Sequence, residues 1–223
     1  MSRLAVTPPG AAFDLRDAPA LLAPVAAVYE AMLDRDGATE AGVGWLDGTQ
    51  VIRFEILAGL IPANEPHLDI ADLGSGYGAF FEYLLAHSRL RLASYVGYDI
   101  SEAMVAAASD RIRDPRATFI QSLIVTQPAD LCFASGTYNV ALGADGASWT
   151  GYILESLKNL ARMSRIGFAF NLLSPASDRD PAIFARPPGI FIDFCRDTLG
   201  GRVRLIEDYG LPEWTLQVTR PDP

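Results

Sequence analysis

Short apolar runs alternate with amphipathic stretches from residue 68 onward, and this alternation limits the fold more than any other feature of the sequence. The apolar runs cover residues 68–73, 94–98, 118–120, 130–134 and 166–172, and the helical patterns cover residues 79–87, 102–113 and 150–163. Nearly continuous apolar strands separated by helices are typical of a parallel sheet that is covered on both faces. The sequence therefore predicts an α/β fold with helices on both faces of the sheet.

The C-terminal part departs from this rhythm. After a predicted helix over residues 191–199, two predicted strands over 203–207 and 213–219 are joined by the short segment 208–212. A connection this short cannot cross over between parallel strands, so the last strand must run antiparallel to its partner. We expect a seven-stranded, mostly parallel sheet whose reversed last strand lies at an edge.

The N-terminal part precedes this alternation and contains two predicted helices. Residues 1–18 are rich in Pro, Gly and Ala and are predicted to form a flexible segment. Apolar residues at helical spacing predict a helix over 19–34, and an Asp47 cap predicts a second helix that ends at Pro62. Residues 63–223 then form the core of what we expect to be one structural domain.

Composition and charge exclude several classes of protein. A net charge of −9 disfavours nucleic acid as a partner, because such binding normally leaves a basic stripe. No apolar run approaches the roughly 20 residues of a membrane helix, and Pro8 and Pro9 interrupt any secretory signal. Cys132 and Cys195 both lie in apolar segments, as expected for free thiols of a reducing compartment. These features favour a cytoplasmic enzyme that acts on a small molecule.

A glycine-rich turn, Asp72-Leu-Gly-Ser-Gly-Tyr-Gly78, lies between the first predicted strand and a helix. Alternating glycines permit positive φ angles and let the backbone approach a ligand closely. Asp99 ends the second strand, where a carboxylate can accept hydrogen bonds from both hydroxyls of a ribose. Dinucleotide enzymes share this arrangement but usually place an apolar residue where Asp72 lies. A carboxylate there favours a cationic ligand, and a nicotinamide dehydrogenase remains the alternative.

At these residues the sequence resembles the class I S-adenosylmethionine (SAM) dependent methyltransferases. Asp72, Gly74, Gly76 and Gly78 match the first family motif, Asp99 matches the second, and the resemblance covers roughly residues 45 to 220. It implies a Rossmann-like sheet with an antiparallel last strand, extra N-terminal helices over residues 19–62 that cap the site, and SAM as cofactor. The residues expected at the cofactor are Asp72, Gly74, Ser75, Gly76, Tyr77, Gly78, Asp99, Ile100, Gln121, Ser122 and Ser135. Gln121 and Ser122 stand where many members carry a third acidic residue.

The acceptor of the methyl group is expected beyond the carboxyl ends of the same strands. Candidate substrate-binding residues are Trp45, Gln50, Arg53, Asn139, Asn171, Tyr209 and Trp214. The connection over residues 175–189 has the composition of a lid or specificity loop. Candidate bases on this side of the sheet are Tyr138 and Asp145, followed by Tyr77 in the glycine turn, whereas His67 and His87 are expected on the far side.

Several absences define the expected chemistry. Ser135 and Asn171 stand where metal-dependent members gather acidic ligands, so no metal is expected. The Asn/Asp-Pro-Pro-aromatic signature of base and amide methylation is missing after the fourth strand. We therefore predict metal-independent methyl transfer to an oxygen or nitrogen of a small metabolite. A non-catalytic SAM-binding or partner subunit and a protein-directed methyltransferase remain alternatives, and the sequence leaves a homodimer open.

Overall fold

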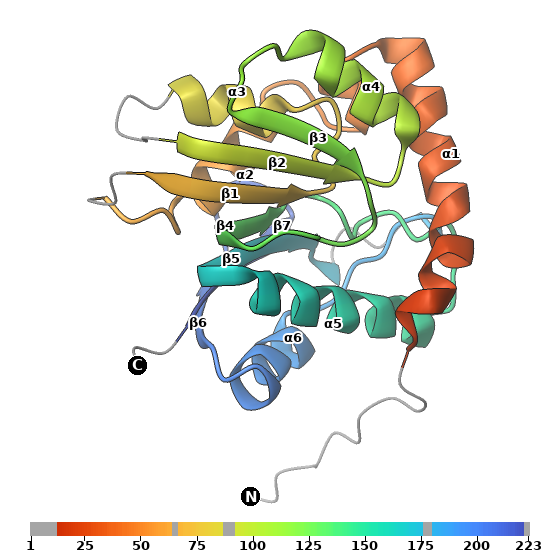
Figure 1. The fold of residues 1–223 in the computed structure, drawn as a ribbon. Helices are drawn as coiled ribbons and strands as arrows, with labels where there is room; N and C mark the ends of the chain where they lie inside the picture. The colour runs from red at the N-terminus through yellow and green to blue at the C-terminus, as the bar shows by residue number, and fades with distance from the viewer. Residues whose placement is uncertain (1–12, 64–66, 87–91, 176–179, 221–223) are drawn as a thin grey trace, which may run out of the picture.

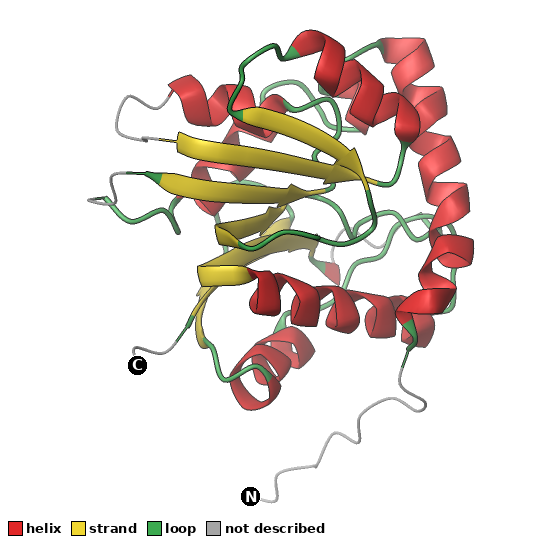
Figure 2. Ribbon diagram, in the orientation of Figure 1, coloured by secondary structure: helices red, strands yellow, loops and turns green. Residues whose placement is uncertain are grey.

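The computed structural model describes residues 13–63, 67–86, 92–175 and 180–220. In this part of the chain, seven strands form one sheet between two layers of helices (Figure 1, Figure 2). The strands are β1 (Leu68–Leu73), β2 (Leu92–Asp99), β3 (Ala117–Gln121), β4 (Ala129–Ala134), β5 (Ser164–Leu173), β6 (Arg202–Ile206) and β7 (Glu213–Thr219). Each overlaps a run predicted from the sequence, so the α/β fold class is confirmed.

The strand order is β3-β2-β1-β4-β5-β7-β6. Strands β1 to β5 are parallel to one another, and β7 is antiparallel to both β5 and β6. The reversed strand therefore lies inside the sheet, and its predicted position at an edge was wrong. Strand β7 is buried along nearly its whole length and needs a partner on each side, whereas β6 alternates between exposed and part-buried residues and suits an edge.

Helices cover both faces of the sheet at the places that the sequence pattern predicts. They are α1 (Ala18–Asp36), α2 (Thr49–Ala58), α3 (Ala79–Ala86), α4 (Glu102–Arg111), α5 (Gly146–Met163) and α6 (Gly189–Asp193), the last continuing as a π-helical turn over Phe194–Thr198. Helix α2 begins later than predicted, because Gly48 and not Asp47 is its N-cap residue. Gly48 has a φ of 77°, a left-handed conformation that glycine adopts readily.

The buried side chains of the central strand β4 alternate between two hydrophobic clusters, one on each face of the sheet. In β4, Leu131 and Phe133 join the cluster that contains Phe54 of α2 and Phe80 of α3. Cys132 and Ala134 face the opposite way and join the cluster formed with α5 and Phe191 of α6. Because helices cover both faces of the sheet, the side chains on both faces of the central strands are buried, which explains the continuous apolar runs in the sequence.

The N-terminal segment runs across the end of the sheet where the arrows of β1, β2 and β3 point (Figure 1). We refer to α1, the 3-10 turn η2 (Ala41–Val43) and α2, residues 18–58, as the cap. Residues 1–12 of the predicted flexible segment lie outside the described residues. The described remainder packs on the core, since the Phe13 ring lies 6.2 Å from that of Tyr152 and Ala18 is buried. Within the described residues, no helix has the length and apolar character to cross a membrane.

Candidate active site

A cavity lies between the cap and the carboxyl ends of the central strands. It contains about 860 Å³ of space not filled by atoms, its open mouth included. Its floor is the glycine turn 72–77 and the segment 135–137 after β4. The cap forms the roof with side chains that include Tyr29, Val43 and Trp45.

The glycine turn and Asp99 form one rigid unit. Gly76 has a φ of 53°, and its N–H donates to Asp99 Oδ2 at 2.8 Å. The N–H of Ser101 donates to Asp99 Oδ1 at 2.9 Å, while the Ser101 hydroxyl caps α4 by accepting from Met104 N–H. Burial raises the pKa of Asp99, and these backbone donors oppose the shift. The carboxylate is thus held in a fixed orientation at the cavity wall.

Asp72, at the end of β1, is a buried carboxyl group with one free oxygen. Its Oδ2 accepts a short hydrogen bond from the Tyr95 hydroxyl, and its Oδ1 has no hydrogen-bond partner among the described residues. Burial is the main cause that raises the pKa of Asp72, to about 7, with nearby Asp99 adding to the shift and Tyr95 opposing it. A positive group in the cavity would favour the ionised form.

Three residues that line the cavity have a buried polar atom without a hydrogen-bond partner among the described residues: Asp72 Oδ1, Ser75 Oγ and Ser135 Oγ. An unpaired buried polar group costs about 1–3 kcal/mol, so such groups rarely cluster without a ligand or water to satisfy them. The cavity therefore has the properties of a binding site for a polar ligand with a cationic part.

Most residues predicted at the cofactor line this cavity. They are Asp72, Gly74, Ser75, Gly76, Tyr77, Asp99, Ile100, Ser122 and Ser135. Gly78 lies behind the turn, where an added Cβ would be 2.4 Å from Ile112 Cδ1. Gln121 is exposed and donates its amide to Ile100 O, beside a neighbouring groove under α1. Gly78 and Gln121 therefore do not line the cavity themselves but lie next to residues that do.

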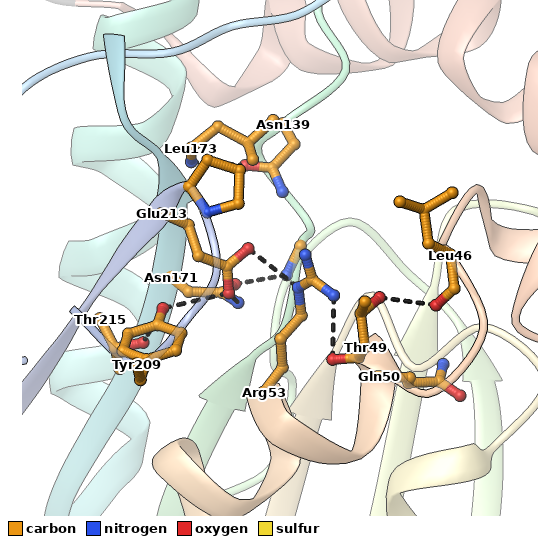
Figure 3. Close-up of polar contacts among 12 residues, drawn as sticks. Leu46, Thr49, Gln50, Arg53, Asn139, Asn171, Leu173, Tyr209, Glu213 and Thr215 are labelled. Atoms are coloured by element: carbon orange, nitrogen blue, oxygen red, sulfur yellow. Dashed lines mark hydrogen bonds and ion pairs between the residues drawn. The ribbon is translucent and has the colours of Figure 1, made fainter. Parts of the chain in front are cut away.

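Of the predicted substrate-binding residues, Trp45 and Gln50 line the cavity. Gln50 accepts a hydrogen bond of 2.8 Å from the Tyr77 hydroxyl and so links the cap to the glycine turn. Arg53, Asn139, Asn171 and Tyr209 lie next to the cavity in a buried polar cluster at the ends of β5 and β7 (Figure 3).

Trp214 and two of the three candidate bases, Tyr138 and Asp145, lie elsewhere, which corrects the sequence interpretation, whereas the third candidate, Tyr77, lines the cavity. Trp214 is buried in the core and donates its indole N–H to Arg186 O. Tyr138 is fully buried, shares a hydrogen bond of 2.8 Å with Ser156, and has a pKa raised by burial. Asp145 is exposed and caps α5 by accepting from Ser148 N–H, which lowers its pKa. A helix-capping aspartate and a core tyrosine occur near the strand ends for structural reasons alone.

The described part of the predicted lid over 175–189 is packed against the core. Val140 bridges to Ile183 and Leu173 to Ala185, and the Phe184 side chain is buried. Residues 176–179 and His87 lie outside the described residues, and His67 is exposed before β1, as expected from its position. No cluster of three or more His, Cys, Asp or Glu side chains that could hold a metal ion occurs in the described ranges.

The sequence interpretation missed several cavity residues. Tyr29 and Val43 come from the cap, Leu123 and Thr137 from the segments after β3 and β4, and Tyr152 from α5. Tyr29 and Tyr152 fit the apolar periodicity of their helices, which gives no sign that they meet near Asp99. Thr137 donates to Leu73 O at 2.7 Å, and its neighbour Gly136 also lines the cavity.

The comparisons with known proteins agree with this site. A family model described as a methyltransferase domain matches residues 71–167, which include the glycine turn and Asp99. The protein named "Putative methyltransferase Rv1506c" of Mycobacterium tuberculosis (strain ATCC 25618 / H37Rv) is 38% identical over 166 residues, which cover 72% of this chain and 98% of that protein. The chain belongs to the class I SAM-dependent methyltransferases.

Solved structures of methyltransferases share the fold. Magnesium protoporphyrin IX methyltransferase (ChlM) from Synechocystis PCC 6803 with bound SAH is 14% identical, with a TM-score of 0.60 over 93% of this chain and 100% of that one. A DhpI–SAH complex is 17% identical, with a TM-score of 0.61 over 91% and 98% of the two chains. The predicted Rossmann-like fold is therefore confirmed.

SAM is the cofactor of this methyltransferase family, and neighbouring structures contain SAM or SAH. The cavity fits such a ligand, because it presents a free carboxylate oxygen, two unpaired serine hydroxyls and a glycine backbone that leaves space for close approach. The predicted cofactor is thus confirmed.

Proposed function

We propose that this methyltransferase transfers the methyl group of SAM to an oxygen or nitrogen atom of a small molecule, without a metal ion. The observation that carries the proposal is the roofed cavity, which lies under the cap and is lined by Asp72, Ser75 and Ser135, three residues with buried, unpaired polar atoms. A roof over the strand ends favours a small acceptor over a polymer chain.

The chain's own residues divide the cavity into a ribose end and a cationic end. Asp99, held by two backbone N–H groups, is the residue that we assign to the ribose hydroxyls. Asp72 Oδ1 is the free anionic atom that we assign to the positively charged part of the cofactor. Ile100, Ser122 and Leu123 lie on the other side of Asp99 from the glycine turn and would contact the base.

The acceptor end lies beside segment 135–139, where Ser135 Oγ and Asn139 Nδ2 are buried without partners among the described residues. Of these two residues Ser135 lines the cavity, and an acceptor that carries an oxygen beside its nucleophilic atom would accept a hydrogen bond from its hydroxyl. Trp45 and Gly136 supply the apolar surface between the acceptor end and the cofactor end.

Catalysis by positioning agrees with the residues at this end. SAM supplies a methyl group on a sulfonium, which is already activated for in-line displacement, and holding the reactants in line can supply roughly 7–11 kcal/mol. Tyr138 and Asp145 do not reach the cavity, and Ser135 and Asn171 are not a ligand set for a divalent ion. The two buried free cysteines agree with a reducing, cytoplasmic setting.

The test is a titration followed by an acceptor screen. Calorimetry with SAH, with NAD as the control, should give micromolar binding of SAH alone. Methyl transfer from radiolabelled SAM to pooled hydroxy, carboxy and amino metabolites should then label a small molecule, while Gly76→Val supplies the inactive control. Binding of SAH without any transfer, together with a stable complex with another protein, would favour a non-catalytic subunit.

A further inference from the structure

A buried ion pair joins the cap to the C-terminal hairpin beside the acceptor end. Arg53 Nε of α2 donates to Glu213 Oε2 of β7 at 2.9 Å, and the two side chains are 5% and 0% exposed (Figure 3). Arg53 also donates to Thr49 O at 3.0 Å in its own helix. Burying both charges is costly, because desolvation offsets much of their attraction, so this pair is not explained by stability alone.

Glu213 binds two further partners with its other oxygen. Oε1 accepts from Asn171 Nδ2 at 3.0 Å and from the Tyr209 hydroxyl at 3.1 Å. Asn171 in turn accepts from Gly136 N–H at 2.6 Å through Oδ1, so its amide is oriented by both contacts. One carboxylate therefore fixes the backbone of the segment that follows β4.

The two branches of this network meet at one contact. The Arg53 guanidinium lies over the Trp45 ring, 3.7 Å from its centroid. The edge of the same ring lies on Gly136, where a Cβ would be 2.1 Å from Trp45 Cζ2. Gly136 has a φ of 69° and no side chain, so the indole reaches the backbone directly. Both Trp45 and Gly136 line the cavity.

We infer that Glu213 is a positioning residue for the acceptor end of the cavity. It holds Trp45 in place through Arg53, and it holds Gly136 in place through Asn171. Glu213 thereby fixes the position of the part of the cavity wall where the Trp45 ring contacts the segment after β4. This inference deepens the proposed function and rests on it in one respect, namely that the acceptor binds at this end of the cavity. The geometry of Glu213 and its partners is a property of the free protein. The hydrogen bonds of Glu213 go to Arg53, Asn171 and Tyr209, whereas those of Asp72 and Asp99 go to other residues of the described chain.

The experiment uses the whole chain labelled with 5-fluorotryptophan and observed by fluorine NMR. The chain has three tryptophans, and Trp45→Phe assigns the Trp45 signal by its loss. Glu213→Gln keeps the shape of the side chain but removes its charge from Arg53, so the Trp45 signal should shift or broaden. The Trp149 signal, from a fully buried residue in α5, should stay in place.

The matched control is Asp130→Asn, which neutralises a partner of Arg165 at the amino ends of β4 and β5, away from the cavity. It should leave the Trp45 signal unchanged. SAH titration of Glu213→Gln should give a dissociation constant within about twofold of the unaltered protein, because sites without shared partners couple weakly.

A Trp45 signal that stays in place while thermal stability falls would overturn the inference and leave Glu213 a purely structural residue. If Glu213→Gln does not fold, Arg53→Lys takes its place, since it keeps the charge but removes the planar group on Trp45 and should move the same signal. Failure of the unaltered protein to bind SAH would contradict the proposed function instead, and the NMR result is independent of it.

Discussion

The raised pKa of Asp72 predicts that SAM binding weakens as the pH falls. With a pKa of about 7, the ionised fraction of Asp72 drops from about 0.9 at pH 8 to about 0.1 at pH 6. If the cationic cofactor binds only the ionised form, its apparent dissociation constant rises in inverse proportion to that fraction, about tenfold. The sign follows from the raised pKa: acid protonates the carboxyl group, and binding of a cation must then expel the proton.

Asp72→Asn is the decisive perturbation. The asparagine can still accept from the Tyr95 hydroxyl, so the local structure is preserved, but no charge titrates. We expect this variant to bind SAM weakly at both pH values. Adenosine is the matched probe, because it is neutral over this range and would contact only the ribose and base ends of the cavity.

Calorimetry in buffers with different ionisation enthalpies measures the protons released. At pH 7 the unaltered protein should release about half a proton for each SAM bound, and Asp72→Asn should release none. Adenosine should bind with the same affinity at pH 6 and pH 8. A pH dependence that persists in Asp72→Asn would refute the assignment of the titrating group.

Three further substitutions test separate parts of the site. Asp99→Ala should weaken SAH binding by about 2–4 kcal/mol, through loss of charge-assisted hydrogen bonds to the ribose; an unchanged affinity in calorimetry would contradict the assignment. Gly76→Val should abolish SAH binding but keep the circular dichroism spectrum, because a side chain at a φ of 53° is strained and its Cβ would lie 3.2 Å from Val43 Cγ1. Asp145→Ala should lose about 1 kcal/mol of stability in urea unfolding, through loss of the helix cap, with normal SAH binding. A large loss of methyl transfer without loss of stability would instead return Asp145 to a catalytic role.

The fold and the cofactor half of the site were accessible from the sequence because their signals are local. Strand and helix runs follow from periodicity, and the turn at 72–78 with Asp99 lies within a single β-α-β unit. Asp99 accepts hydrogen bonds from the backbone of Gly76, 23 positions earlier, and of Ser101, two positions later. All three residues therefore fall within one short stretch of the sequence. The place of β7 inside the sheet was missed because a hairpin gives the direction of a strand but not its other neighbour.

The acceptor half was only partly accessible because its contacts join distant segments. Arg53 and Glu213 are 160 positions apart, and Asn171 lies 42 positions from Glu213. Sequence patterns selected Arg53 and Asn171 as polar residues at strand ends or on the cap, but they gave no reason to select Glu213. Tyr138 and Asp145 were selected by the same criterion and proved to be a core residue and a helix cap.

This division between local and distant contacts has a consequence for specificity. The cofactor end is built on a rigid turn whose geometry leaves little room for change, since Gly74 and Gly78 would each clash with their neighbours if they gained a side chain. The acceptor end is built from the cap and the C-terminal hairpin, which are joined there by the side chains of Arg53 and Glu213. Substitutions at Trp45, Arg53 or Glu213 can therefore reshape the acceptor end while the cofactor end stays intact, and changes of acceptor among related chains should concentrate there.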